Sequence, residues 1–170
     1  RNCPNPESNV TQEASHSARN MRTSLSCERH NVKIYSKTVP VEIRSSNGKS
    51  TTCLAIIDEQ SSRTFIDEKL MNLLSVPEND CTSNVYTLRT LNRLNSTVHG
   101  YSVQKLSARS TKNGKWINLP PALTHPSLPD TSGETASPQA VRSISHIRRF
   151  SSSFAEVDQS LEVLLLIGAD

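Results

Sequence analysis

Two short apolar runs, residues 54–57 and 163–167, set the main limit on what this chain can fold into. Each run is only as long as a β-strand, and each is too densely apolar for a strand with one face in water. A membrane span would need about 20 apolar residues. The runs therefore predict two strands buried within one β-rich unit, with Ile56 and Ile167 buried near each other.

The first buried run belongs to a predicted hairpin. Residues 39–44 alternate between apolar and polar side chains, which is typical of a half-buried strand. The dipeptide Asn47-Gly48 follows, and Asn-Gly is the strongest short hairpin signal. The return strand is predicted at residues 51–57.

A helix and further strands follow the hairpin. Ile66, Leu70, Leu73 and Leu74 have the spacing of a short amphipathic helix, and Asp67 can cap its start. Because strands outnumber helices, the pattern predicts an all-β fold with one short helix. The further strands are predicted at residues 84–91, 97–108, 115–119 and 161–167.

Composition limits how much of the chain can join this core. Only 34% of the residues are hydrophobic and 4% are aromatic, which is low for a globular chain. We expect residues 1–30 to be a flexible segment, because they show no periodicity and few large apolar residues. Residues 120–160 contain five of the nine prolines and are predicted to be a long irregular insertion with a short helical turn near residues 139–147.

Charge and cysteine content exclude some functions. The formal net charge of +3 is too small to indicate nucleic-acid binding by itself. Cysteines stand at positions 3, 27, 53 and 81 without a C-x-x-C pair, which favours free thiols over a metal site. No metal or other cofactor is expected.

The residues directly after the first buried run are candidates for chemistry. The segment reads Asp58-Glu59-Gln60-Ser61, and a carboxylate just past a buried strand occupies a common position for a catalytic acid. The same residue types also end strands in ordinary turns, and the spacing alone favours neither interpretation.

The order of features is strand, Asn-Gly turn, buried strand, Asp-x-x-Ser, short helix, several strands and a last apolar strand that ends in Ile-Gly-x-Asp. This order resembles the retropepsin-like aspartic peptidases, and more closely the aspartic peptidase domain of Bel/Pao-type retrotransposon polyproteins. The matching segments are residues 55–66, 86–91, 136–140 and 164–170. Together they cover roughly residues 32–170.

The resemblance implies a closed barrel and a role for several residues. Asp58 would be the catalytic carboxylate, and Glu59, Gln60 and Ser61 would complete its loop. A hairpin flap would close over the substrate, and an apolar strand would cross behind the catalytic loop. The flap tip would include Arg93, Leu94 and Asn95, and the crossing strand would include Ile167 and Gly168.

The resemblance also implies how the domain is organised. Residues 31–170 would form the peptidase domain, cut short at its C-terminal end, because a helix and a dimer-forming strand follow this point in the family. Residues 1–30 would be a linker whose first six residues resemble the tail of a Gag-type zinc knuckle ending at Cys3. Asp170 is predicted to cap a helix rather than to act in catalysis.

Only one suitable aspartate is expected per chain. Asp130-Thr131-Ser132-Gly133 follows no buried strand and has one residue too many before its glycine. An active enzyme would therefore be a symmetric homodimer that brings two copies of Asp58 together. Its implied substrate is its own polyprotein, in the cytoplasm of the cell within virus-like particles. Contact with nucleic acid is expected only through neighbouring Gag-like segments, and no membrane contact is expected.

Two departures from the family pattern keep a second function open. The family has Thr or Ser and then Gly after the catalytic Asp, where this chain has Glu59 and Gln60. Glu59 cannot copy the hydroxyl's bond to the partner subunit, and Gln60 adds a side chain where the backbone approaches the carboxylates. An inactive structural or assembly module is therefore an alternative. A third interpretation, an RNA-associated linker, depends on the Gag-like first residues and on the basic cluster at residues 146–149.

Overall fold

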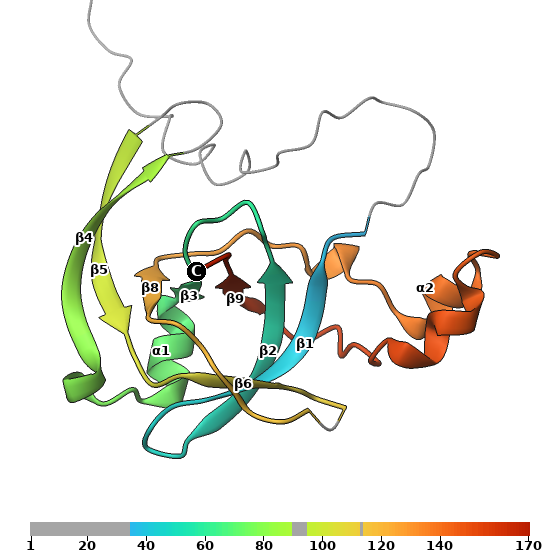
Figure 1. Ribbon diagram of the computed structural model, residues 1–170, viewed down its shortest axis with the longest axis horizontal. Helices are drawn as coiled ribbons and strands as arrows, with labels where there is room; N and C mark the ends of the chain where they lie inside the picture. Colours follow the sequence, from blue (N-terminus) through green and yellow to red (C-terminus); the bar gives the residue numbers. More distant parts are fainter. Residues whose placement is uncertain (1–34, 90–94, 113) are drawn as a thin grey trace, which may run out of the picture.

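The computed structural model describes residues 35–89, 95–112 and 114–170, and these residues form mainly β-sheet with few helices (Figure 1). The predicted flexible segment, residues 1–30, lies outside the described residues. The strands are β1 Thr38–Arg44, β2 Ser50–Ile57, β3 Phe65–Asp67, β4 Cys81–Arg89, β5 Asn95–Val103, β6 Ser107–Ser110, β7 Ile117–Asn118, β8 Ala122–His125 and β9 Val163–Ile167. The α-helices are α1 Glu68–Leu74 and α2 Pro138–Arg142, and 3-10 turns occupy Glu78–Asp80, Ser132–Glu134 and Arg148–Ser153.

The strands form one sheet in the order β4-β5-β8-β3-β9-β2-β1-β6-β7. The predicted closed barrel is wrong, because this ladder is open and has β4 and β7 at its two edges. β7 has two residues, both exposed, and at the other edge β5 pairs with β8 only at Ser102 and Val103. The β4–β5 hairpin therefore projects away from the rest of the sheet instead of closing it (Figure 1).

Strand β9 lies between β2 and β3, although almost a hundred residues or more separate it from either strand along the chain. It runs parallel to β2 and antiparallel to β3. Ile56 and Ile167 are on neighbouring strands as expected, but both are only half-buried. The fully buried residues lie slightly earlier, at Ala55 and Leu165, so the burial predicted for the strand ends was too deep.

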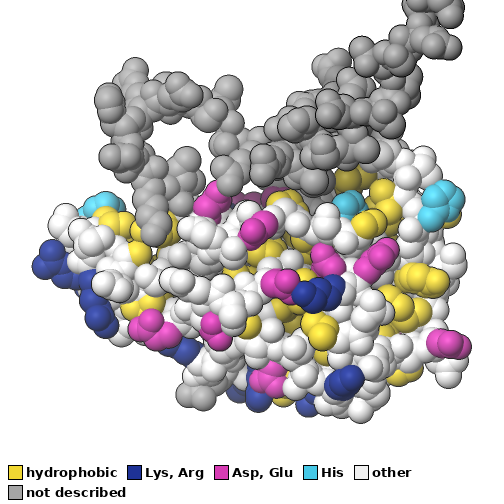
Figure 2. Space-filling model, turned by 180° about the vertical axis from the view of Figure 1, so that it is seen from behind, with side chains coloured by type: hydrophobic (Ala, Val, Ile, Leu, Met, Phe, Trp, Pro, Cys, Tyr) yellow, Lys and Arg dark blue, Asp and Glu magenta, His cyan; other side chains and the backbone are white. Residues whose placement is uncertain are grey.

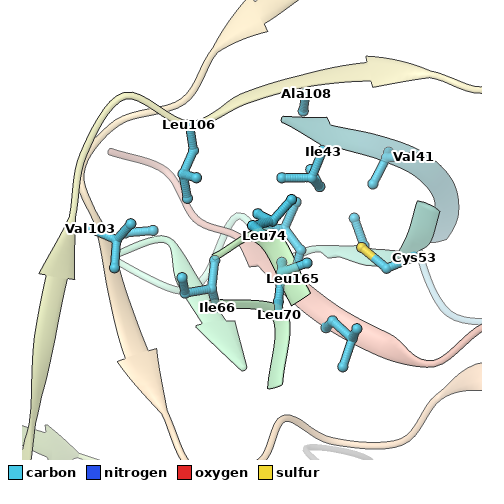
Figure 3. Close-up of a cluster of buried hydrophobic side chains, with 13 residues drawn as sticks. Val41, Ile43, Cys53, Ile66, Leu70, Leu74, Val103, Leu106, Ala108 and Leu165 are labelled. Carbon is cyan, nitrogen blue, oxygen red and sulfur yellow. The ribbon is translucent and has the colours of Figure 1, made fainter. Parts of the chain in front are cut away.

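The main core lies between the sheet and α1 (Figure 3). Asp67 accepts a hydrogen bond from the backbone N–H of Lys69 and so caps α1, as its sequence predicts. Leu70 and Leu74 are buried in the core, whereas Leu73 is 43% exposed. The core side chains are Val41, Ile43, Cys53, Ala55, Ile66, Leu70, Leu74, Val103, Leu106, Ala108, Ala122, Leu164 and Leu165.

Three local elements differ from the sequence-based expectation. Ile66 belongs to β3 rather than to the helix. The single strand predicted at residues 97–108 is split into β5 and β6, because Lys105 adopts a left-handed backbone with φ 57°. Residues 120–160 contain a central strand, β8, and a short helix, α2, whose N-cap Ser137 accepts a hydrogen bond from the N–H of Ala140.

The rest of the insertion is attached to the start of β1. The hydroxyls of Thr38 and Thr131 are 2.8 Å apart, and the N–H of Ser36 donates to the carbonyl of Glu134. Among the described residues, no helix is long and apolar enough to cross a membrane.

Candidate active site

Asp58 lies directly after β2, at the start of a loop that leads to β3. Its carboxylate Oδ1 accepts a hydrogen bond of 3.0 Å from the N–H of Gln60, and its carbonyl accepts one of 3.1 Å from the N–H of Ser61. The side chain is therefore held in a tight turn and is half-buried. The half-buried Asp58 carboxylate is thus held at the end of a buried strand.

The loop is supported by the end of β9. The N–H of Asp58 donates to the carbonyl of Ile167 at 2.9 Å, and the N–H of Ala169 donates to the carbonyl of Ser61 at 2.9 Å. Gly168 lies between these two bonds. A Cβ at this position would come within 3.0 Å of the carbonyl oxygens of Ser61 and Arg63, so the chain can pass this close only with glycine.

Thr64 links the same two segments through its side chain. Its fully buried hydroxyl accepts from the N–H of Gly168 at 3.2 Å and donates to Oδ1 of Asp170 at 2.9 Å. The other carboxylate oxygen of Asp170 is 3.8 Å from the guanidinium of Arg63. The predicted helix cap at Asp170 therefore takes part in holding the Asp58 loop to β9, a role that its position in the sequence does not reveal.

Glu59 and Gln60 both have exposed side chains. The carboxylate of Glu59 forms an exposed ion pair of 2.6 Å with Lys37, just before β1. The side chain of Gln60 is exposed, and its contribution to the turn is its backbone N–H. Ser61 donates its hydroxyl to the carbonyl of Arg63 at 2.7 Å, so it stabilises the loop from within.

The predicted flap corresponds in position to the β4–β5 hairpin, whose strands pair from Cys81 with Val103 to Arg89 with Asn95. Its strands overlap those predicted at residues 84–91 and 97–108. Arg93 and Leu94, predicted at its tip, lie outside the described residues. Asn95 is the first residue of β5 and is exposed.

A groove of about 630 Å³ lies between the Asp58 loop and the hairpin. One wall comes from residues 60–63 and the other from β4, between Asn84 and Arg89. Its floor comes from β3, β5 and β8. Asp58 itself is not among the described residues that line the groove, but residues 60–63 of its loop form one wall.

Two aromatic rings line the groove, Phe65 from its floor and Tyr86 from its β4 wall. The rings of Phe65 and Tyr86 have centroids 5.7 Å apart, and the hydroxyl of Tyr86 donates to the carbonyl of Thr124 at 2.8 Å. Burial, with a smaller effect from the negative charge of Glu68, raises the pKa of Tyr86 to about 12. Its hydroxyl therefore stays protonated and directed into the sheet, and its ring is left to shape the groove.

Sequence reasoning singled out residues 58–61 and 167–168, which the structure brings into contact, but it did not point to the β4 wall or to the floor of the groove. One signal was available, since Asn84, Tyr86 and Leu88 alternate along a predicted strand and so share a face. Among the described residues, no three His, Cys, Asp or Glu side chains are placed to hold a metal ion.

Comparison with known proteins gives no further assignment. No protein-family model, no curated protein and no solved structure matches this chain.

Proposed function

We propose that this chain is a retropepsin-like aspartic endopeptidase domain that cleaves peptide bonds of its own polyprotein as a homodimer. The observation that carries the proposal is the support of the Asp58 loop by Ile167, Gly168 and Ala169. It fixes the loop that carries the Asp58 carboxylate and that forms one wall of a groove of about 630 Å³.

The dimer is required by the chemistry. Two carboxylates at close range cannot both ionise, so they share one proton. The ionised Asp58 would take a proton from water as its oxygen bonds to the peptide carbonyl carbon, and the protonated one would donate a hydrogen bond to the carbonyl oxygen. Proton transfer to the amide nitrogen then lets the C–N bond break. Two symmetry-related copies of Asp58 supply the pair.

The inactive-module alternative is favoured by the residues after Asp58. Glu59 is held by Lys37 and offers no hydroxyl to a partner subunit. A carboxylate there would also add negative charge beside the proposed pair. This alternative keeps the same fold and the same dimer without turnover.

The RNA-associated reading has less support. Arg148 donates its Nε to the carbonyl of Arg142, and Arg149 lies over the ring of Phe150 at 4.7 Å. On the face seen in Figure 2, several Lys and Arg side chains gather at the left edge, and the others are scattered among acidic and apolar ones. A broad basic face, which RNA-backbone binding favours, is not apparent in that view.

The test is processing of the natural full-length polypeptide with Asp58→Asn as the key variant. Asn keeps the shape of the side chain and removes the base. Asp130→Asn is the matched control, because Asp130 only caps a turn through the hydroxyl and N–H of Ser132. We expect processing that a statine-type inhibitor blocks, that Asp58→Asn abolishes and that Asp130→Asn leaves unchanged.

The opposite outcomes separate the two functions. Processing that survives Asp58→Asn would exclude the peptidase. If the wild type shows none but the double variant Glu59→Ser, Gln60→Gly does, the natural chain is the inactive module.

A further inference from the structure

The charge of the groove between the Asp58 loop and β4 is one-sided. Of the described residues that line it, Arg63 and Arg89 are charged and none is acidic. Arg63 lies on the loop wall and Arg89 on the strand wall, at opposite sides of the same space. A concave surface that carries one sign of charge concentrates ligands of the opposite sign.

The two arginines differ from four other basic side chains that the structure describes. Lys37, Lys69, Lys105 and Arg109 form ion pairs with acidic residues of the fold. Arg89 has no such pair with a described residue, and Arg63 has only the long 3.8 Å contact with Asp170 while its side chain is 64% exposed. Both guanidinium groups can therefore bind a carboxylate of a ligand by donating hydrogen bonds to it.

The shape of the strand wall indicates an extended ligand. Successive side chains of a strand point to opposite faces, yet consecutive β4 residues, from Tyr86 to Arg89, all line the groove. The groove therefore runs along the edge of β4 as well as over one face. β4 is an edge strand of the described sheet, so its outer backbone groups can pair with an added chain.

The floor adds an apolar requirement. Phe65 and Leu123 lie on the floor, and the contact of the Phe65 ring with Tyr86 of the strand wall leaves a packed surface rather than a slot for base stacking. Two arginines are also few for a nucleic-acid backbone, whose affinity grows with each neutralised phosphate. A peptide can pair with the edge of β4, place apolar side chains on the floor and offer a carboxylate to the arginines.

We propose that the groove selects extended peptide segments in which a Glu or Asp side chain, held by Arg63 and Arg89, lies next to large apolar residues. This inference deepens the proposed function, on which it depends for its biological role, and it assigns the substrate class of the same site. Binding itself does not need the catalytic pair, so the two can be tested separately.

The experiment measures binding to the full chain with Asp58→Asn, so that no peptide is consumed. Three peptides, blocked at both ends, share a central Leu-Phe and differ only in flanking Glu, Gln or Lys, and calorimetry gives each Kd. We expect the Glu peptide to bind about fivefold more tightly than the Gln peptide, the size expected for two partly exposed ion pairs. The Lys peptide should bind most weakly, and high salt should remove the preference.

Variants assign the effect to the groove. Arg89→Gln should lower the Glu-over-Gln preference about twofold, and adding Arg63→Gln should remove it. Arg149→Gln, which changes an arginine outside the groove, should leave it unchanged. Arg63→Gln removes the contact with Asp170 and could harm folding. Arg89→Gln removes no such contact with a described residue, so it tests the inference in either case.

Several results would overturn the inference. These are equal Kd values for the three peptides, no measurable binding of any of them, a preference that survives both arginine changes, or displacement of the peptide by a single-stranded RNA oligonucleotide. Processing by the wild type without any preference for acidic sites would overturn the inference but keep the peptidase. Selective binding without processing would overturn the peptidase alone.

Discussion

The two walls of the groove are held in different ways. The Asp58 loop is tied to β9 by backbone bonds at Asp58 and Ala169 and by the hydroxyl of Thr64. The β4–β5 hairpin has ladder pairs with the sheet only near its base, where Ser102 and Val103 pair with β8, and further up it is held by hydrogen bonds of Tyr86 and Tyr101 to Thr124. One wall is therefore built into the sheet and the other projects from it (Figure 1).

Burial follows the same division. No residue of β4 is fully buried, and in β5 only Val103 is. Val85 and Tyr101 are 56% and 46% exposed, whereas Thr64 and Leu165 have no exposed surface. Because local stability follows burial and anchoring, we expect the loop to keep its geometry while the outer hairpin opens readily. The loop that carries Asp58 would then stay in place while the β4–β5 hairpin moves, and this suits a site that a polypeptide ligand must enter.

The largest effect is expected from Gly168→Ala. The added Cβ would meet the carbonyl oxygens of Ser61 and Arg63 within 3.0 Å, and backbone atoms cannot move aside cheaply. We expect a loss of about 3 kcal/mol in the free energy of unfolding, at the upper end of what overpacking costs. Urea unfolding measures this. Gly133→Ala is the control, because an added Cβ there meets nothing within 4 Å, and a similar loss in both would contradict the close passage.

Two valine substitutions allow the buried base of the β4–β5 hairpin to be compared with its exposed outer part. Val103→Ala removes two methyl groups from a fully buried site, whereas Val85→Ala removes them from a site that is 56% exposed. We expect a loss of about 2 kcal/mol for Val103→Ala, from lost transfer energy and an added cavity, and below about 0.5 kcal/mol for Val85→Ala. Equal losses in thermal or urea unfolding would mean that the whole hairpin is anchored.

Thr64→Val tests the side-chain link between the loop and β9. The change keeps the shape but leaves the N–H of Gly168 and a carboxylate oxygen of Asp170 without this partner. We expect a loss of about 1–2 kcal/mol, the cost of unsatisfied buried groups. Thr87→Val on exposed β4 is the control and should change little. Faster amide exchange at Gly168 in Thr64→Val would locate the effect, and unchanged exchange would argue against the link.

The parts of the fold that could be predicted depend on neighbours in the sequence. The turn at Asn47-Gly48, with Gly48 at φ 85°, the cap at Asp67 and the position of Asp58 after a buried strand are all encoded within a few residues. The dense apolar run of β9 also predicts its burial. These features make the all-β class readable from the sequence.

The parts that could not be predicted depend on contacts between distant segments. β8 has four residues directly after Pro120-Pro121, which look like the start of a loop, yet β3 and β5 pair with it on either side. Ile66 has helical spacing to Leu70, but pairing with β8 and β9 draws it into a strand. The closed barrel was expected only because of the family resemblance, and no local sequence pattern could test that expectation. The groove floor depends on the same distant pairings.

The smallest expected effect concerns the turn that leads into the hairpin. Hydrogen bonds from Lys105 and then Ser46 hold the pKa of Asp80 below its usual value. A carboxylate with a lowered pKa in the folded state adds stability above its unfolded pKa of about 3.9, and this stability is lost as the pH falls through the folded pKa. Lys105 is 64% exposed, so solvent and salt weaken the pair.

Urea unfolding at pH 7 and at pH 3 should therefore show a smaller acid-induced loss for Asp80→Asn than for the wild type. Glu78→Gln removes an exposed carboxylate from the same turn and should keep the wild-type dependence. The same acid-induced loss in Asp80→Asn and wild type would show that this ion pair does not anchor the base of the hairpin.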